Sequence, residues 1–388
     1  MSQGWTYVFP RMGNSYIGFK AFFDVVGKEV ILPKPMNKRI LELGVKYAPE
    51  GMCFPFKVLL GQFIDILESY KDRKFKLVSL GQYGPCRFGY YTVLHEKILK
   101  ELGYKNFEML TLDGSLAHPL PLGIWRELKA IAQLLGFNPP WKLMQGFVNA
   151  GYKIYFTELI EKKAYYIMAR ELTEGEGEKA FEKALKILYN APSNSLKAIK
   201  SAYKKAMDTL NNVEYDENKE TLKIGLIGEA YIIMDHDNNL NVEKKLANLG
   251  VDTDRSLRVT NWAYDRVMHR NEHKKKMLKI NEGYLDYFIG GDGQESIMNT
   301  ILYKENGFDG VIHLLPFGCL PETVAKQVLA TVSHDYDIPV LSLTFDEQTG
   351  EAGIVTRLEA FVDLLWQRKK GRKVQVSVLS NKKEEVPV

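Results

Sequence analysis

Residues 75–81 (FKLVSLG) form a nearly continuous apolar run that leads directly into a loop rich in glycine and proline. This pattern is typical of a parallel strand that is buried on both faces, because a half-exposed strand alternates polar and apolar residues. Further strand and helix patterns alternate with it along the first 115 residues. The expected strands are 5–10, 29–33, 75–81 and 107–113, and the expected helices are 16–26, 56–67 and 87–102. Strands that alternate with helices of this length predict an α/β layer with a parallel sheet.

The strand signals fade from about residue 119 to residue 210, where helical periodicity in Ala, Lys and Glu dominates, as in 158–172 and 179–188. Residues 211–220 (NNVEYDENKE) are polar and acidic and suit a linker. The alternation then resumes. Strands are expected at 222–233, 284–291, 309–318 and 338–346, and helices at 242–249 and 357–367.

The predicted fold is therefore α/β, with two Rossmann/flavodoxin-like parallel-sheet domains and a helical segment between them. An N-terminal α/β domain is expected at 1–118 and contains Cys53 and Cys86. The helical segment covers 119–218, and a C-terminal α/β domain with Cys319 covers 219–370. Residues 371–388 are polar and charged and are expected to form a mobile tail.

Composition narrows the range of partners. The net charge of +4 is small for 388 residues and gives no support for binding nucleic acid, and the basic runs 269–276 and 368–373 suit solvated surfaces. The N-terminus lacks the features of a secretory signal, and no apolar run reaches the roughly 18 residues of a membrane span. We therefore expect a cytoplasmic protein that acts on a small molecule and binds no membrane.

The three cysteines occupy similar positions. Cys53, Cys86 and Cys319 each follow glycine or proline and open an expected helix, and apolar strands lead into the last two loops. A helix N-terminus favours thiolate over thiol, and ligand sites of α/β sheets lie beyond the carboxyl ends of the strands. Three such cysteines suit a shared metal cluster, although their spacing matches no compact zinc or ferredoxin motif. The alternative is three unrelated core cysteines.

Several segments together resemble a known family. They are Pro10–Gly13 (PRMG), Glu50–Pro55 (EGMCFP), Gly84–Arg87 (GPCR), Asp309–His313 running into Cys319, and the ending from Asp346 to Phe361. Their order over most of the chain is similar to that of the 2-hydroxyacyl-CoA dehydratase component family, with the related benzoyl-CoA reductase cluster subunits and double-cubane-cluster proteins.

The resemblance implies a 4Fe–4S cluster held by Cys53, Cys86 and Cys319, with one iron open to other ligands. It also implies a separate activator, an ATPase of actin-like fold with its own iron–sulfur cluster. The chain contains no GxxxxGK[S/T] loop, which agrees with ATP hydrolysis by a partner. One chain with three cysteines could ligate only one cubane, so a double-cubane cluster would have to be shared between chains. A homodimer, or a heterodimer with a related subunit, is expected.

Glu50, His313 and Glu322 are the protonatable residues nearest to the cysteines in sequence and are candidates for proton transfer. Helix capping and core packing are the structural alternatives for these residues. Residues 290–293 (GGDG) are expected to form a tight turn rather than an anion site.

The predicted function is the iron–sulfur component of an ATP-dependent two-component system. It would take low-potential electrons from the activator and reduce or dehydrate a small substrate, such as an acyl-CoA. The first alternative is a non-catalytic iron–sulfur electron carrier or cluster-maturation protein. The second is a cluster-free α/β binding domain with structural cysteines.

Overall fold

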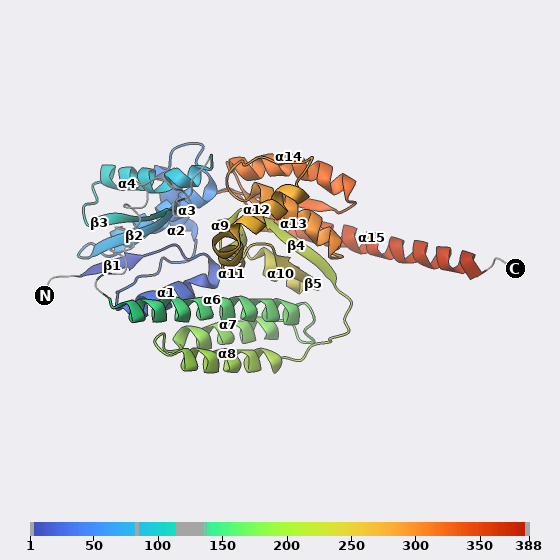
Figure 1. Ribbon diagram of the computed structural model, residues 1–388, viewed down its shortest axis with the longest axis horizontal. Coiled ribbons are helices and arrows are strands. Elements are labelled where there is room, and N and C mark those ends of the chain that lie inside the picture. The colour runs from blue at the N-terminus through green and yellow to red at the C-terminus, as the bar shows by residue number, and fades with distance from the viewer. Residues whose placement is uncertain (1–3, 82–84, 114–135, 137, 385–388) are drawn as a thin grey trace.

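The computed structural model describes residues 4–81, 85–113, 136 and 138–384. Two parallel sheets lie side by side above a layer of helices (Figure 1). The first sheet has the order β1-β2-β3, and its strands are β1 (Trp5–Val8), β2 (Lys74–Gly81) and β3 (Phe107–Asp113). The second has the order β5-β4-β6-β7, and its strands are β4 (Leu222–Gly228), β5 (Val251–Arg255), β6 (Gly310–Pro316) and β7 (Val340–Phe345). The predicted α/β fold with two parallel sheets is confirmed.

The central strands are buried because helices cover both faces of the second sheet. Every residue of β6 is buried, as its continuous apolar sequence predicts. Gly225 in β4 is needed for this packing, since a Cβ atom there would lie 2.3 Å from the ring of Tyr303 in α13 (Gly293–Glu305). The absence of a side chain at Gly225 lets this helix lie directly on the sheet.

The N-terminal sheet is covered by α1 (Tyr16–Val26), α2 (Lys38–Tyr47), α3 (Phe54–Ser69) and α4 (Tyr91–Glu101). Helices α2 and α3 touch through their backbones. A Cβ atom on Gly44 would lie 1.8 Å from the carbonyl oxygen of Lys57, and one on Gly61 would lie 1.9 Å from that of Ile40. This close contact buries nearly all of α3, the helix that begins immediately after Cys53.

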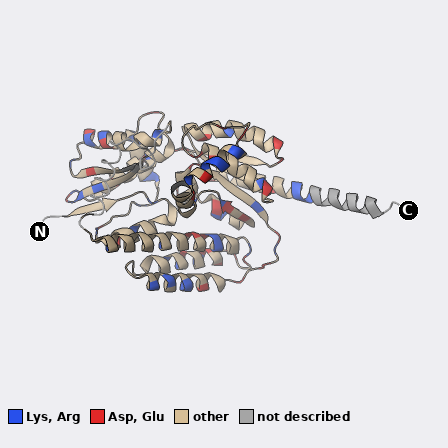
Figure 2. Ribbon diagram, in the orientation of Figure 1, with Lys and Arg blue, Asp and Glu red and all other residues tan. Residues whose placement is uncertain are grey.

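The helical segment consists of α6 (Pro140–Met168), α7 (Glu176–Asn190) and α8 (Leu196–Asn211), which stack below both sheets (Figure 1). The predicted helix at 179–188 lies within α7, and the one predicted at 158–172 corresponds to the last part of α6, which ends at Met168. Alanines line their contacts, including Ala164, Ala184 and Ala206, which are fully buried. Positive and negative side chains are interspersed along the helices (Figure 2).

Buried ionic contacts join α6 to the C-terminal sheet. Arg255, at the end of β5, forms ion pairs with Glu161 of α6 and with Glu243 of α10 (Val242–Asn248). Glu161 also contacts His236 at 3.1 Å and accepts a hydrogen bond from Asn14 at 2.8 Å. These contacts link the segment after β1 and the helical layer to the second sheet.

The remaining elements surround the second sheet. They are α9 (Ala230–Met234), α11 (Val259–Ala263), the π-helix η4 (Tyr264–Met268), α12 (Arg270–Ile280), α14 (Leu320–Asp335) and α15 (Glu351–Glu384). Helix α15 projects beyond the body of the molecule (Figure 1). Residues 371–384, which were expected to belong to a tail, are part of this helix. The mobility of that tail and the division of the chain into four predicted segments remain predictions.

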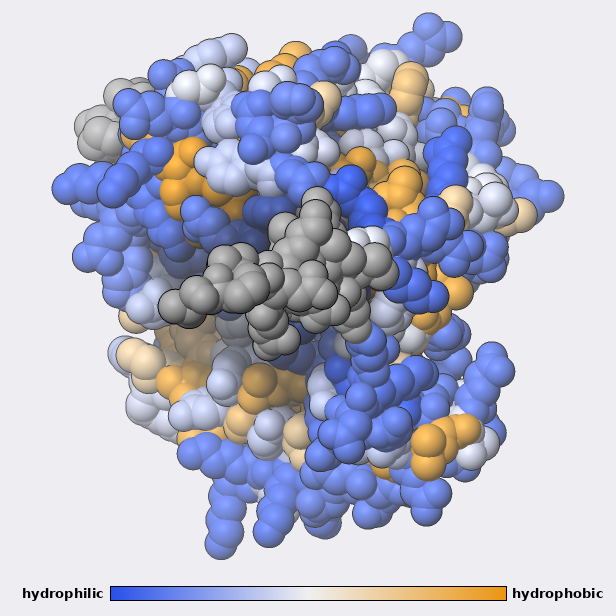
Figure 3. Space-filling model, turned by 90° about the vertical axis from the view of Figure 1, so that its right-hand side faces the viewer, coloured by the Kyte–Doolittle hydropathy of each residue, from blue (hydrophilic) through white to orange (hydrophobic). Residues whose placement is uncertain are grey.

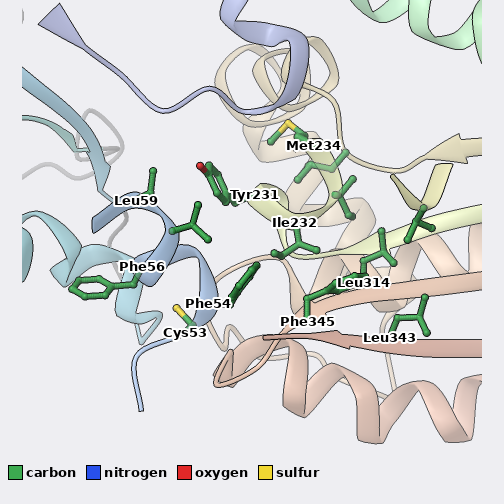
Figure 4. Packing of buried hydrophobic residues seen from close by; sticks show 14 of the residues in the cluster. Cys53, Phe54, Phe56, Leu59, Tyr231, Ile232, Met234, Leu314, Leu343 and Phe345 are labelled. Atoms are coloured by element: carbon green, nitrogen blue, oxygen red, sulfur yellow. The ribbon is translucent and has the colours of Figure 1, made fainter. Parts of the chain in front are cut away.

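One apolar core runs between the two sheets. Figure 4 shows Cys53 and Phe54 at the start of α3 on the side that faces Ile232 of α9 and Phe345 of β7. The outer face seen in Figure 3 is mainly hydrophilic, with small apolar patches. No helix in the described part of the chain is both long and apolar enough to cross a membrane.

Two strand predictions are wrong. In the segment 29–33 only Val30 pairs with the first sheet, through a single bridge to Tyr7, and the segment then runs into Pro33 and Pro35, which lack an N–H. The segment 284–291 is not a strand, because Gly290 and Gly291 have φ angles of 82° and 54° and turn the chain. Strand β5 and helix α2 were not expected from the sequence.

Candidate functional site

Each of the three cysteines is the residue immediately before a helix. Cys53 precedes α3, Cys86 precedes the short 3-10 helix η2 (Arg87–Tyr90), and Cys319 precedes α14. All three have an extended backbone there. The thiols of Cys53 and Cys319 are buried and that of Cys86 is partly buried. The predicted positions at helix starts are therefore confirmed.

The loops that carry the cysteines pack against one another. A Cβ atom on Gly318 would lie 3.5 Å from Cα of Cys53, which places the Cys319 loop directly against the Cys53 loop. A Cβ atom on Gly290 would lie 2.9 Å from the backbone nitrogen of Cys86, and one on Gly291 would lie 4.0 Å from its Sγ. The turn at 290–293 therefore packs on the Cys86 loop, and glycines face two of the three cysteines.

The site lies where the topology of the second sheet predicts a ligand. Strand β4 is the first strand of this sheet in sequence, and the chain adds β5 on one side of it and β6 on the other. Crevices at such reversals, beyond the carboxyl ends of the strands, are the usual ligand sites of open α/β sheets. Glu229 follows β4 and Cys319 lies in the loop after β6, so both stand at this crevice.

Aromatic side chains enclose the Cys53 thiol. The hydroxyl group of Tyr91 forms a hydrogen bond with Sγ of Cys53, and the Tyr91 ring meets Phe56 and Phe88 edge to face, with centroids 5.1 Å apart in both pairs. Aromatic residues are frequent in and after the Cys86 loop, and Phe88 and Tyr91 pack against each other there. Tyr90 is 56% exposed, and Tyr83 lies outside the described residues.

The thiols are held in their neutral form, contrary to the expectation for helix N-termini. Burial, together with the nearby Cys53, Glu229 and Asp292, raises the pKa of Cys86 to about 11. Burial also raises the pKa values of Cys53 and Cys319. Backbone N–H groups lower these pKa values, but desolvation outweighs them. Cys53 raises the pKa values of both Cys86 and Cys319, and Glu229 raises those of all three thiols, so the three share one electrostatic environment.

His313 and Glu322 are brought together by the fold. Nε2 of His313 lies 2.8 Å from a carboxylate oxygen of Glu322, and both side chains are completely buried. Ser296 donates a hydrogen bond to the same oxygen at 2.9 Å, and the other Glu322 oxygen has no hydrogen-bond partner among the described residues. Glu50 is exposed in the loop before Cys53, away from this pair.

Two acidic residues at the site were not predicted. Burial, together with the Asp292 carboxylate, raises the pKa of Glu229 to about 8. Glu229 caps α9 by accepting a hydrogen bond from the Ile232 N–H at 3.0 Å, and Asp292 accepts one from the Ala230 N–H at 3.1 Å. The position of Glu229 immediately after a buried strand was the signal that could have identified it.

Among the described residues, no three His, Cys, Asp or Glu side chains are grouped so as to hold a single metal ion. The site is instead an assembly of three thiols from three loops, with Glu229, Asp292 and Glu322 around them. It joins the N-terminal sheet to the C-terminal one.

Two models of known families match parts of the chain. Residues 157–365 match the family described as 2-hydroxyglutaryl-CoA dehydratase, D-component, and residues 11–75 match the CoA enzyme activase uncharacterised domain. Cys319 lies in the first match, Cys53 in the second, and Cys86 between them. No curated protein matches the chain. Because the first match covers more than half of its length, the chain belongs to the 2-hydroxyglutaryl-CoA dehydratase D-component family.

Proposed function

We propose that Cys53, Cys86 and Cys319 hold one 4Fe–4S cluster, and that the chain is the iron–sulfur component of an ATP-dependent two-component reductase or dehydratase. Membership of the family implies an acyl-CoA dehydratase-type component, and the family typically carries an iron–sulfur cluster. The observation that carries the proposal is the approach of the Cys86 and Cys319 thiols to Cys53, whose charge raises the pKa values of both, beside Glu229 at the carboxyl end of β4.

The residues present fit such a cluster. The buried thiols of Cys53 and Cys319 and the partly buried thiol of Cys86 resist losing their protons, because burial disfavours the thiolate and the nearby Glu229 raises the pKa of all three. A positively charged iron core would remove that penalty, as metals do for coordinating thiols. The absence of side chains at Gly290, Gly291 and Gly318 lets the backbones of these turns lie directly against the loops that carry the cysteines.

With three thiolate ligands, a bound cluster would have one iron free to act as a Lewis acid and as the point of electron entry. The chain's own residues prepare the surroundings. The rings of Phe56, Phe88 and Tyr91 exclude water from the Cys53 side. The backbone N–H groups of Phe88 and Glu322 donate to the thiols of Cys86 and Cys319.

Glu50, His313 and Glu322 remain our candidates for proton transfer. The buried position of His313 and Glu322 supports a role in holding a proton between Nε2 and the carboxylate, at a fixed distance of 2.8 Å. Glu50 is exposed, which supports exchange of protons with solvent at the entrance to the Cys53 loop.

The partner in this proposal is a separate activator ATPase with an actin-like fold and its own iron–sulfur cluster. The match of residues 11–75 to a CoA enzyme activase domain supports an activator partner. The substrate would be a small molecule of the acyl-CoA class, supported by the family described for residues 157–365. A homodimer, or pairing with a related subunit, belongs to the same proposal.

The first test is the iron and acid-labile sulfide content of strictly anaerobic protein, with EPR of the dithionite-reduced sample. We expect about four irons per chain in the wild type and their loss in Cys86→Ala. Thr323→Val is the matched control, because Thr323 lies in the first turn after Cys319, where its hydroxyl donates to the Cys319 carbonyl, and it carries no thiol. Wild-type protein without iron would overturn the proposal.

Two further results would change the form of the proposed iron–sulfur function. About eight irons per dimer, with spectra of coupled cubanes, would indicate a double-cubane cluster shared between chains. An EPR signal that does not change when an exogenous iron ligand is added would indicate a coordinatively closed carrier cluster, and would favour the electron-carrier alternative over an enzyme.

A further inference from the structure

A second pocket lies beside the cysteine site, on the other side of α13. Its volume is about 370 Å³, and it is enclosed by the loop after β5, by α11, η4 and α12, and by one face of α13. The lining residues are Ser256, Leu257, Asn261, Trp262, Tyr264, Asp265, His269, Glu272, His273, Lys276, Glu295, Met298, Asn299 and Leu302. A volume of this size lies in the usual range of small-molecule sites.

The charge of the lining selects against anions. Three carboxylates, those of Asp265, Glu272 and Glu295, face the pocket, whereas Lys276 is the one lysine or arginine among the described side chains of its lining. Carboxylates accept hydrogen bonds and cannot donate them, so they favour a ligand that presents N–H groups. A ligand carboxylate or phosphate would be repelled.

The remaining walls suit a flat ring. Trp262 and Tyr264 provide aromatic faces, and Leu257, Met298 and Leu302 provide apolar contacts. Trp262 is 42% exposed and Tyr264 is 55% exposed, so both rings retain surface for a ligand. Aromatic faces attract both stacked rings and cations.

The polar groups of the pocket are held in place by contacts within the protein. Nε2 of His273 lies 2.9 Å from a Glu295 oxygen, and its Nδ1 lies 3.8 Å from an Asp265 oxygen. The rings of Tyr264 and His269 contact each other with centroids 4.1 Å apart and a tilt of 32° between their planes. Tyr264 and Asp265 lie in the π-helix η4, a type of element frequently found at functional sites.

Helix α13 separates this pocket from the cysteine site. Glu295 faces the pocket and binds His273, whereas the next residue, Ser296, donates its hydrogen bond to Glu322 beside Cys319. The pocket also follows β5, the strand next to β4, so it lies at the same end of the second sheet as the cysteines.

We propose that this pocket binds a small ligand with a flat aromatic ring that carries N–H donors and is neutral or positively charged, such as an aromatic amidine, an aromatic amide or an amino-substituted heterocycle. The ring would lie against Trp262 and Tyr264, and its N–H groups would donate to the carboxylates. This site is additional to the proposed iron–sulfur function and does not depend on it.

Benzamidine, benzamide and benzoate test the proposal, because they share one shape and differ in charge. Calorimetric titration of the full-length protein should give the order benzamidine, benzamide, benzoate, with benzamidine binding at least about tenfold more tightly than benzoate, a difference of about 1.4 kcal/mol. The protein can be prepared with or without iron, so a failed cluster proposal would not affect the result. Binding of benzoate as tight as that of benzamidine, or no binding of benzamidine and benzamide, would overturn the proposal of this pocket as a ligand site.

Substitutions at Asn299 locate the site. Asn299→Asp should strengthen benzamidine binding several-fold, and Asn299→Lys should weaken it and reverse the preference toward benzoate. Asn306→Asp and Asn306→Lys are the matched controls, because Asn306 is exposed at the end of the same helix and outside the pocket. Trp262→Leu should weaken all three ligands. Equal effects of the Asn299 and Asn306 variants would contradict binding in this pocket.

Discussion

The carboxylate of Glu322 lies 2.8 Å from Nε2 of His313, although neither side chain has any contact with solvent. Glu322 stands in the first turn of α14 after Cys319, and His313 stands in the middle of β6. The pair therefore ties the loop that carries Cys319 to the central strand of the second sheet.

Replacing Glu322 by alanine should destabilise the protein. Glu322→Ala leaves His313 and Ser296 without their buried partner, and we expect a loss of about 3 kcal/mol in the free energy of unfolding. Denaturant titration of the iron-free protein measures this. Glu359→Ala, at an exposed position of α15, should change stability by less than about 0.5 kcal/mol. Equal effects of the two changes would show that the pair contributes nothing to the fold.

Gly290→Ala should disturb the Cys86 loop. The added methyl group would lie 2.9 Å from the Cys86 nitrogen, so the 290–293 turn could not pack there without moving. Gly283→Ala is a matched control, because both glycines have a φ of 82° and a Cβ atom on Gly283 meets nothing within 4 Å. Both variants should lose about 1 kcal/mol from backbone strain. Only Gly290→Ala should also lose iron, measured as iron per chain; retention of all its iron would contradict the packing argument.

Tyr91→Phe should alter the thiol environment without unfolding the protein. It removes the hydroxyl group that bonds to Cys53 and keeps the ring that packs between Phe56 and Phe88. We expect a stability loss of about 1 kcal/mol, unchanged iron content and a lower reduction potential, since hydrogen bonds to ligand sulfur raise the potential. Potentiometric titration followed by EPR measures the potential. An unchanged potential would show that the hydroxyl does not act on the bound cluster.

Acid should destabilise the N-terminal domain through His95. This side chain is completely buried, and burial lowers its pKa from 6.5 to about 3. The unfolded chain binds a proton below pH 6.5 that the folded chain binds only near pH 3, so stability falls as the pH falls through this window. The expected loss is about 2 kcal/mol at pH 5 and roughly 5 kcal/mol at most.

The measurement for His95 is the free energy of unfolding at several pH values for wild type and for His95→Gln, which should lack this part of the pH dependence. His334→Gln provides the comparison, because the His334 side chain is 89% exposed. If His95→Gln and wild type lose stability in parallel below pH 6.5, buried His95 is not the cause.

The sequence determined much of the fold because its signals are local. The apolar runs at 75–81 and 309–318 became β2 and β6, since a strand buried on both faces needs apolar residues at nearly every position. The helix at 16–26 was predicted with its observed bounds. The glycine and proline residues that precede the three cysteines likewise predicted correctly that each cysteine lies at the start of a helix.

Local patterns failed where neighbours in space decide the structure. Strand β5 (VDTDR) is polar because it lies at the edge of its sheet, so its sequence resembles a loop. The apolar segment 284–291 resembles a strand, but Gly290 and Gly291 take left-handed conformations that turn it toward Cys86 and Pro321. Neither outcome can be derived from a window of a few residues.

Only the tertiary structure decided how the site is assembled. The sequence identified Cys53, Cys86 and Cys319 as a group, but their approach depends on two sheets meeting and on glycine contacts between distant loops. The same is true of Glu229, which the sequence analysis did not select, and of the raised thiol pKa values. Burial sets these pKa values, and burial depends on which segments, far apart in the chain, cover one another.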